Sequence, residues 1–181
     1  MHVRFSTCTG MPVVAENEDS VPGQIAGIFI HPDTGTVEGF FVQTGGLFGG
    51  QELFLATADI RHWGTRVRVR SEDVLSPPGE RVRLQSIVQE NRPLLGQNIL
   101  TKSGTRVGRC RDVQFETKTF RLEWLFPRRW LRWGSPVPAS AIIEVKREAI
   151  IVRDAFAGER GAVLKVIDEI AESVPRMPEA G

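Results

Sequence analysis

A short β-hairpin near the start of the chain decides its fold. The sequence reads QIAGIFIH from Gln24 to His31, PDTG from Pro32 to Gly35, and TVEGFFVQT from Thr36 to Thr44. The first run alternates apolar and other residues, and the second is rich in Val and Phe, as strands are. Between them, Pro, Asp and Gly favour a tight turn. The stretch therefore predicts two antiparallel strands joined by a turn.

The hairpin pattern occurs a second time 85 residues later, where Arg109–Glu116 and Thr119–Phe126 repeat the two strands around Thr117-Lys118. The register continues upstream at a shift of 86 residues and downstream at a shift of 82. The aligned pairs are Gly10 with Gly96, Gly23 with Gly108, Phe41 with Phe126, Ile60 with Ile142, Val67 with Ala149, and Val69 with Ile151. Such self-similarity indicates two copies of one small module.

Each copy supplies about five or six short strands, typical of a small barrel that closes to hide its edges. Arg66–Arg70 alternates strictly, as a half-buried strand does, whereas Ala149–Val152 is apolar throughout and indicates a more fully buried strand. We therefore predict an all-β fold of two tandem small β-barrels with a C-terminal amphipathic α-helix. The predicted boundaries are a first barrel at 6–78, a connector at 79–91 with a strand-like run at Val82–Val88, a second barrel at 92–155 and the helix at 159–174.

The C-terminal helix is predicted from its apolar spacing. Val163, Ile167, Ile170 and Val174 fall on one helical stripe, charged residues face away, and Pro175 ends the helix. Because a single helix gains most of its stability from packing, we expect it to dock on one of the barrels, with partner binding as the alternative.

Charge is balanced overall but not along the chain. The formal net charge is +1, yet residues 1–80 carry 5 basic and 10 acidic side chains, whereas residues 81–153 carry 15 and 6. This balance excludes a wholly basic nucleic-acid-binding chain. Two cysteines exclude a disulfide framework or a cysteine-built zinc site. The apolar runs are too short to span a bilayer and the first residues do not form a signal peptide, so we expect a cytoplasmic protein.

Both copies show a further shared order: a glycine followed by apolar residues, a turn, a glycine that opens an alternating strand, and later an Ala/Ser-apolar step before a final apolar strand. The stretches are Gly10–Val14, Pro22–Ile25 and Asp33–Gly35 in the first copy, and Leu95–Leu100, Arg106–Gly108 and Ser140–Ile143 in the second. Over residues 10–153 this order resembles the PRC-barrel domain, named from the photosynthetic reaction-centre H subunit and also found in a ribosome maturation factor. The resemblance implies a module that docks onto protein complexes, ribosomal and membrane complexes included, without catalysis.

Two features depart from the family pattern. The second hairpin has Thr117-Lys118-Thr119 where the first has a turn glycine, and the early turn Ala15–Val21 of the first copy is longer and acidic. Ribosome maturation factors carry one such barrel behind a different N-terminal barrel. That architecture is the alternative, but the register between the two copies argues against it.

The two copies differ most after the hairpin. The first continues as a glycine-rich loop, Gln43–Gly50, whereas the second continues as PRRWLRWG, Pro127–Gly134. Arg and Trp anchor interfaces through bidentate hydrogen bonds, stacking and large buried areas. Alternatively, the loop tryptophans cap the barrel ends and the arginines are merely solvated. The predicted partner-binding residues are Arg128, Arg129, Trp130, Arg132 and Trp133.

Three kinds of partner fit this loop. An acidic protein surface would pair with the arginines, RNA would stack its bases on the indoles, and an anionic membrane surface would take both at headgroup depth. The acidic first copy and the absence of a recognised RNA-binding motif weigh against RNA. We therefore predict an adaptor or assembly protein that docks on a protein complex, with an RNA-associated ribosome maturation role or anionic-membrane attachment as alternatives. Pairing into a homodimer stays open.

Signals for catalysis are poor. His2, His31 and His62 lack paired spacing, and no nucleophile motif is present, so we expect no catalytic residue, cofactor, metal ion or small-molecule substrate. Cys110 takes the position of Ile25 and should pack as a small apolar residue, whereas Cys8 is expected to be a candidate exposed thiol.

Overall fold

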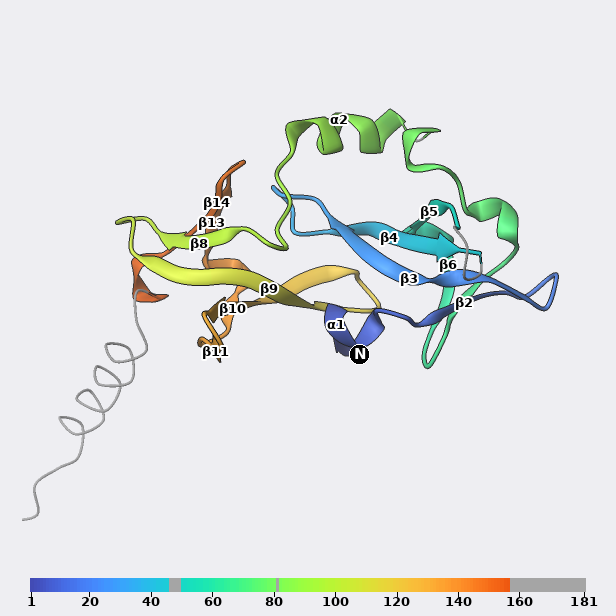
Figure 1. The fold of residues 1–181 in the computed structure, drawn as a ribbon, viewed down its shortest axis with the longest axis horizontal. Helices are drawn as coiled ribbons and strands as arrows, with labels where there is room; N and C mark the ends of the chain where they lie inside the picture. Colours follow the sequence, from blue (N-terminus) through green and yellow to red (C-terminus); the bar gives the residue numbers. More distant parts are fainter. Residues whose placement is uncertain (46–49, 81, 157–181) are drawn as a thin grey trace, which may run out of the picture.

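The computed structural model describes residues 1–45, 50–80 and 82–156, which form two curled β-sheets (Figure 1). The predicted helix at 159–174 and the centre of the glycine-rich loop, 46–49, lie outside the described residues. The described chain is predominantly β-structure, so the all-β prediction is confirmed at this level.

The first sheet has six strands in the order β5-β4-β3-β2-β7-β6. All neighbours are antiparallel except β2 and β7, which run parallel. The strands are β2 (Pro12–Ala15), β3 (Ser20–Ile30), β4 (Val37–Thr44), β5 (Glu52–Ala56), β6 (Ile60–Trp63) and β7 (Val67–Val69).

The second sheet repeats this arrangement as β11-β10-β9-β8-β14-β13, with β8 and β14 as its parallel pair. A short strand, β12, also pairs with β10, as β5 pairs with β4. The strands are β8 (Asn98–Thr101), β9 (Arg106–Glu116), β10 (Arg121–Arg129), β11 (Arg132–Trp133), β12 (Val137–Pro138), β13 (Ile142–Val145) and β14 (Ala149–Val152). We call β2–β7 the first half and β8–β14 the second half.

Two glycines show that the halves repeat at the level of single residues. The Gly10 amide donates to the Ile25 carbonyl at 2.8 Å, and the Gly96 amide donates to the Cys110 carbonyl at the same distance. Both glycines have φ near +80°, at +82° and +84°, a conformation that side chains disfavour. Both long strands also bulge at equivalent points, between Ile25 and Gly27 and between Cys110 and Asp112. At these points the two halves therefore have the same local geometry.

The downstream register predicted for the repeat is wrong by one residue. Val13 pairs with Val67 in the first sheet, and its counterpart Ile99 pairs with Ile150 in the second. Val67 is therefore equivalent to Ile150, and not to Ala149, because four residues separate the paired Val145 and Ile150, whereas three separate the paired Trp63 and Val67. A slip of one residue moves every side chain to the opposite face, so the buried pair in β14 is Ile150 and Val152.

The connector between the halves is helical, which corrects the strand-like prediction for Val82–Val88. Helix α2 spans Val82–Glu90. Its apolar residues Leu84, Ile87 and Val88 are spaced three and four apart, which suits a helix better than the two-residue period of a strand. The short helical turns η3 (Pro78–Glu80) and η5 (Asp154–Phe156) lie before α2 and after β14.

The N-terminal segment belongs to the second sheet, although it precedes the first half in sequence. Strand β1 (His2–Arg4) pairs antiparallel with β9, opposite residues Gln114–Glu116. The next turn, α1 (Phe5–Cys8), holds Ser6, whose amide and hydroxyl both donate to the Asp112 carboxylate, at 3.0 and 2.6 Å. These bonds satisfy a carboxylate that is only 2% exposed.

Arg92, just after α2, attaches the connector to the first half. Its guanidinium donates to both carboxylate oxygens of Asp33, at 2.7 and 2.8 Å, and to the carbonyl of Val145 at 3.1 Å. It also contacts Glu90. The hydrogen bonds from Arg92 hold the pKa of Asp33 below its usual range. The connector therefore contacts the hairpin turn of one half and β13 of the other.

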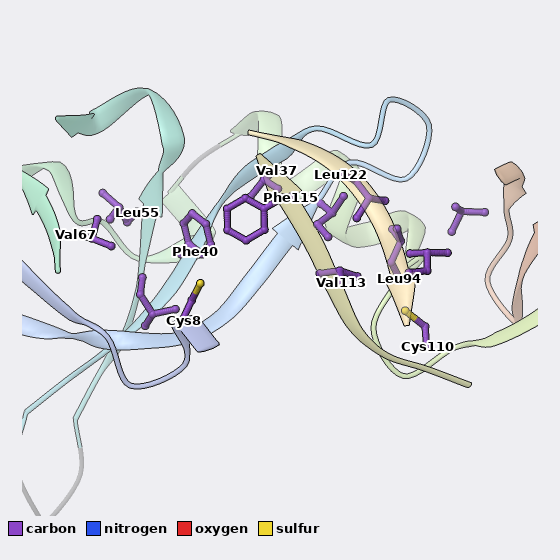
Figure 2. Close-up of a cluster of buried hydrophobic side chains, with 14 of the residues drawn as sticks. Cys8, Val37, Phe40, Leu55, Val67, Leu94, Cys110, Val113, Phe115 and Leu122 are labelled. Atoms are coloured by element: carbon purple, nitrogen blue, oxygen red, sulfur yellow. The ribbon is translucent and has the colours of Figure 1, made fainter. Parts of the chain in front are cut away.

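One core runs through both halves (Figure 2). Phe40 of the first half and Phe115 of the second are fully buried, with ring centroids 5.7 Å apart, and Trp63 and Phe120 pack against both. The backbone continues this contact, because the Val37 amide donates to the Phe120 carbonyl at 2.7 Å. The two halves therefore share their most buried aromatic side chains.

Candidate functional site

The predicted Arg/Trp loop is a β-hairpin formed by β10 and β11. Arg129 pairs with Arg132 across the ladder, so Trp130 and Leu131 alone make the turn. Trp130 has φ +53°, in the left-handed region where a bulky side chain is unusual. Its side chain is 96% exposed and that of Leu131 is 85% exposed. Trp130 therefore does not cap the end of a sheet, which was the alternative to a contact site.

The base of the hairpin is more firmly held than its tip. Arg128 pairs with Trp133 across the ladder, and its guanidinium lies over the indole, 5.6 Å from the ring centroid. Arg128 is half-buried, and its Nε atom is buried without a hydrogen-bond partner among the residues that the structure describes. The Gly134 amide closes the base by donating to the Pro127 carbonyl at 2.9 Å. Arg128 and Trp133 thus support the hairpin, although Trp133 remains 52% exposed.

The tip is positively charged and locally unneutralised. Arg129 and Arg132 are exposed, and within the described ranges neither forms an ion pair. No acidic residue occurs between Glu123 and Glu144. Two like charges face each other across the ladder, an arrangement that is unfavourable in isolation. An anionic partner would relieve this repulsion and receive bidentate hydrogen bonds from the guanidinium groups.

Sequence reasoning missed Leu131 as part of the candidate site. Leu131 lies between two predicted site residues, and its place at the second turn position makes it as prominent as Trp130. Trp124 lies further back on β10, opposite Gln114 and Pro138, and is 39% exposed. The site consists of Arg128, Arg129, Trp130, Leu131, Arg132 and Trp133, which we call the Arg/Trp hairpin.

The equivalent position in the first half has different chemistry. Strand β4 ends at Thr44, whose amide donates to the Gln51 carbonyl at 2.9 Å and whose hydroxyl donates to the same oxygen at 3.0 Å. Neither residue is charged or aromatic. The repeated scaffold therefore carries two unlike loops.

The cysteines lie in the core. Cys8 is fully buried, so the expectation of an exposed thiol is wrong: it lies in α1, packed against the second sheet. Cys110 is fully buried at the position of Ile25, as predicted. Burial raises the pKa of Cys8 to about 11 and that of Cys110 to about 12, so both thiols stay protonated and unreactive at neutral pH.

Within residues 1–45, 50–80 and 82–156, no three His, Cys, Asp or Glu side chains come together in a way that would hold a metal ion. His2 lies beside Glu123, with its Nδ1 atom 2.8 Å from the carboxylate, on the exposed surface. No helix in the same part of the chain has the length and apolar character needed to cross a bilayer.

No family model matches this chain, and no curated protein matches it significantly.

Proposed function

We propose that this protein is a non-catalytic docking protein of the PRC-barrel type, two tandem barrel-like modules that bind a protein complex through the Arg/Trp hairpin. The observation that carries the proposal is the exposure of Trp130 and Leu131 at the apex of a hairpin whose flanking Arg129 and Arg132 form no ion pair with any described residue. Large apolar side chains in that position gain free energy only when something covers them.

The free energy available from burying the tip residues is large enough to support a binding interface. Burying a large apolar side chain contributes about 1.5–3 kcal/mol, so Trp130 and Leu131 together offer roughly 3–6 kcal/mol before the costs of association. Their arginine neighbours add orientation and faster association with an acidic surface. These are the residue types that dominate binding energy at protein interfaces.

A protein partner fits better than RNA because the basic surface is local. A protein that holds RNA non-specifically needs a basic groove along several nucleotides. Here the basic tip belongs to the second half, while residues 1–80 carry an excess of five acidic side chains. RNA and an anionic membrane surface are therefore the alternative partners, and the experiment below distinguishes them from a protein.

The test compares wild-type protein with Arg129→Glu/Trp130→Ala/Arg132→Glu in affinity capture from lysate, with and without nuclease. Arg128 is left intact because its half-buried side chain, stacked on Trp133, supports the hairpin. The matched control, Arg111→Glu/Arg153→Glu, makes the same change in charge at exposed arginines elsewhere in the second half. Near-ultraviolet circular dichroism and thermal unfolding establish that all three proteins are folded.

We expect a defined set of proteins to be captured by wild type and by the control and lost with the hairpin variant, and at least one of them to bind the purified protein directly. Equal capture by all three proteins would refute a role for the hairpin. Release of the captured material by nuclease would replace the proposal with the RNA alternative. Sedimentation of wild type, but not the hairpin variant, with anionic vesicles and not with neutral ones would replace it with the membrane alternative.

A further inference from the structure

A groove on the first half has the properties needed to receive the Arg/Trp hairpin. Its volume is about 500 Å³, and it lies between the start of β3 and the end of β4. Val21, which is 62% exposed, and two prolines supply its apolar surface. The lining residues are Pro12, Val21, Pro22, Gly23, Gln24, Gln43 and Gly45. Proline and valine surfaces suit an indole ring, and the glutamine amides offer carbonyl oxygens to its N–H group.

The turn that precedes this groove in sequence is acidic. The β2–β3 turn, Glu16–Asp19, is separated from Val21 by Ser20 alone, and its Glu18 and Asp19 side chains are exposed. Within the described residues neither carboxylate forms an ion pair, whereas Glu16 lies 3.5 Å from Arg68. The neighbouring turn after β7 adds further carboxylates at 72 and 73, and arginines at 68 and 70 offset only part of this charge. The two adjacent turns at this end of the first half therefore carry net negative charge, close in sequence to Val21 of the groove.

The hairpin cannot reach this groove within one molecule. The β2–β3 turn forms the right-hand end of the long axis in Figure 1, whereas β11 lies in the left third. A contact between the two surfaces must therefore join two copies of the chain, and it uses a different surface on each copy.

We propose that this protein self-associates head to tail, with the Arg/Trp hairpin of one copy in the Pro12/Val21/Pro22 groove of the next. This inference rests on the proposed docking function and names one partner for it, a second copy of the chain. Trp130 and Leu131 enter the apolar groove, and Arg129 and Arg132 face Glu18 and Asp19. Because each copy keeps a free hairpin at one end and a free groove at the other, assembly continues beyond a dimer, into a ring or an open chain.

Mixing two variants provides the decisive test, measured by sedimentation velocity over a concentration series. The hairpin variant is Arg129→Glu/Trp130→Ala/Arg132→Glu, which leaves the groove intact. The groove variant is Glu18→Lys/Val21→Lys, which changes only exposed side chains and leaves the hairpin intact. Each variant alone lacks one of the two surfaces, but a mixture contains one intact copy of each.

We expect wild type to form species larger than a dimer as the protein concentration is raised to about 1 mM. A dissociation constant of that size corresponds to an association free energy of roughly 4 kcal/mol. These species should dissociate in about 0.5 M salt, where screening is strong. Each variant alone should be monomeric, and the mixture should form dimers and nothing larger. The Arg111→Glu/Arg153→Glu control should assemble like wild type.

Three results would overturn the inference: monomeric wild type throughout the series, assembly unchanged in either variant, or a mixture that stays monomeric. None of them bears on docking to a separate partner, because capture that depends on the hairpin would persist with a monomeric protein. Conversely, equal capture by wild type and hairpin variant, together with mixture-dependent dimers, would refute the wider docking function and leave self-association standing.

Discussion

The two halves of this molecule share a scaffold and differ in one connection. Both have the same strand order, the same parallel pair and the same bulge in the long central strand. After the second strand of each hairpin, however, the first half continues from Thr44 into a glycine-rich loop, whereas the second half extends into the Arg/Trp hairpin.

This difference teaches which residues are constrained by folding and which are free to specialise. The bulge, and the positive-φ glycines Gly10 and Gly96, occur in both halves because the curled sheet needs them. The connection after the hairpin is different in each half because the scaffold tolerates either sequence there. Chemistry confined to one of two equivalent positions is therefore a stronger sign of function than chemistry present in both.

The largest expected effect breaks the shared core. Phe115→Ala should lower the free energy of unfolding by about 3–5 kcal/mol, because Phe115 is fully buried between the halves and packs on Phe40 and Trp63. Since the core is continuous, denaturant should produce one transition in which both sheets unfold together. Phe54→Ala, within the first half, is the comparison. If denaturant instead produced two separate transitions, each shifted by only one of the two substitutions, the halves would unfold independently.

A smaller effect tests the equivalence of Gly23 and Gly108, which lie at matching positions in β3 and β9. A Cβ atom at Gly23 would lie 2.5 Å from the Gln43 carbonyl oxygen, and one at Gly108 would lie 2.9 Å from the Pro127 Cβ. Alanine at either position should cost about 1–3 kcal/mol, with Gly23 the more sensitive because backbone yields less readily than a ring. Gly79→Ala, with open space around it, is the neutral control in urea unfolding. If alanine were tolerated at only one of the two positions, the two glycines would not be structurally equivalent.

A weaker effect concerns the connector. The lowered pKa of Asp33 means that the ionised carboxylate stabilises the folded state. This contribution is complete above the ordinary Asp pKa of about 3.9 and is lost as the pH falls through the lower folded-state value. Asp33 is 57% exposed, so we expect Asp33→Asn to cost at most about 1 kcal/mol at pH 7 and progressively less as the pH falls below the ordinary Asp pKa. A difference between wild type and variant that grows on acidification would contradict this assignment.

The smallest effect on stability is expected at the tip of the hairpin. Trp130→Gly relieves the left-handed backbone of Trp130 but adds flexibility to the unfolded chain, and the two terms nearly cancel. We expect the thermal midpoint to change little, by an amount equivalent to about 0.5 kcal/mol, while hairpin-dependent binding falls strongly. A large loss of stability would mean that Trp130 supports the fold after all.

The local parts of this fold could be predicted from sequence. The hairpins, the repeat and the fully apolar β14 follow from alternation and turn residues, which act between near neighbours. The one-residue shift in β14 could not be predicted because nothing in Lys146–Ala149 marks an additional residue between the paired Val145 and Ile150. The alternation of Val82 and Leu84 predicts a strand, whereas the spacing of Leu84, Ile87 and Val88 is that of the helix α2 observed.

The candidate site was predicted by composition, but its internal division needed the structure. Clustered Arg and Trp residues identified the hairpin, and the structure separates a supporting pair, Arg128 and Trp133, from an exposed tip. That distinction depends on ladder pairing and on where a two-residue turn falls. The pairing of β1 with β9 could not be predicted either, because the three residues of β1 carry no local pattern that identifies so distant a strand as their partner.

That pairing has a consequence for the order in which the molecule assembles during synthesis. Ser6 and its partner Asp112 are separated by 106 residues. At translation rates of about 5–20 residues per second, the first turn of the chain waits roughly 5–20 seconds for its binding strand to be made. Throughout that interval Cys8 and its apolar neighbours have no strand to cover them, whereas they are buried in the finished protein. The N-terminal segment therefore completes its contacts only after β8 and β9 have been synthesised, so the start of the chain folds together with the second half.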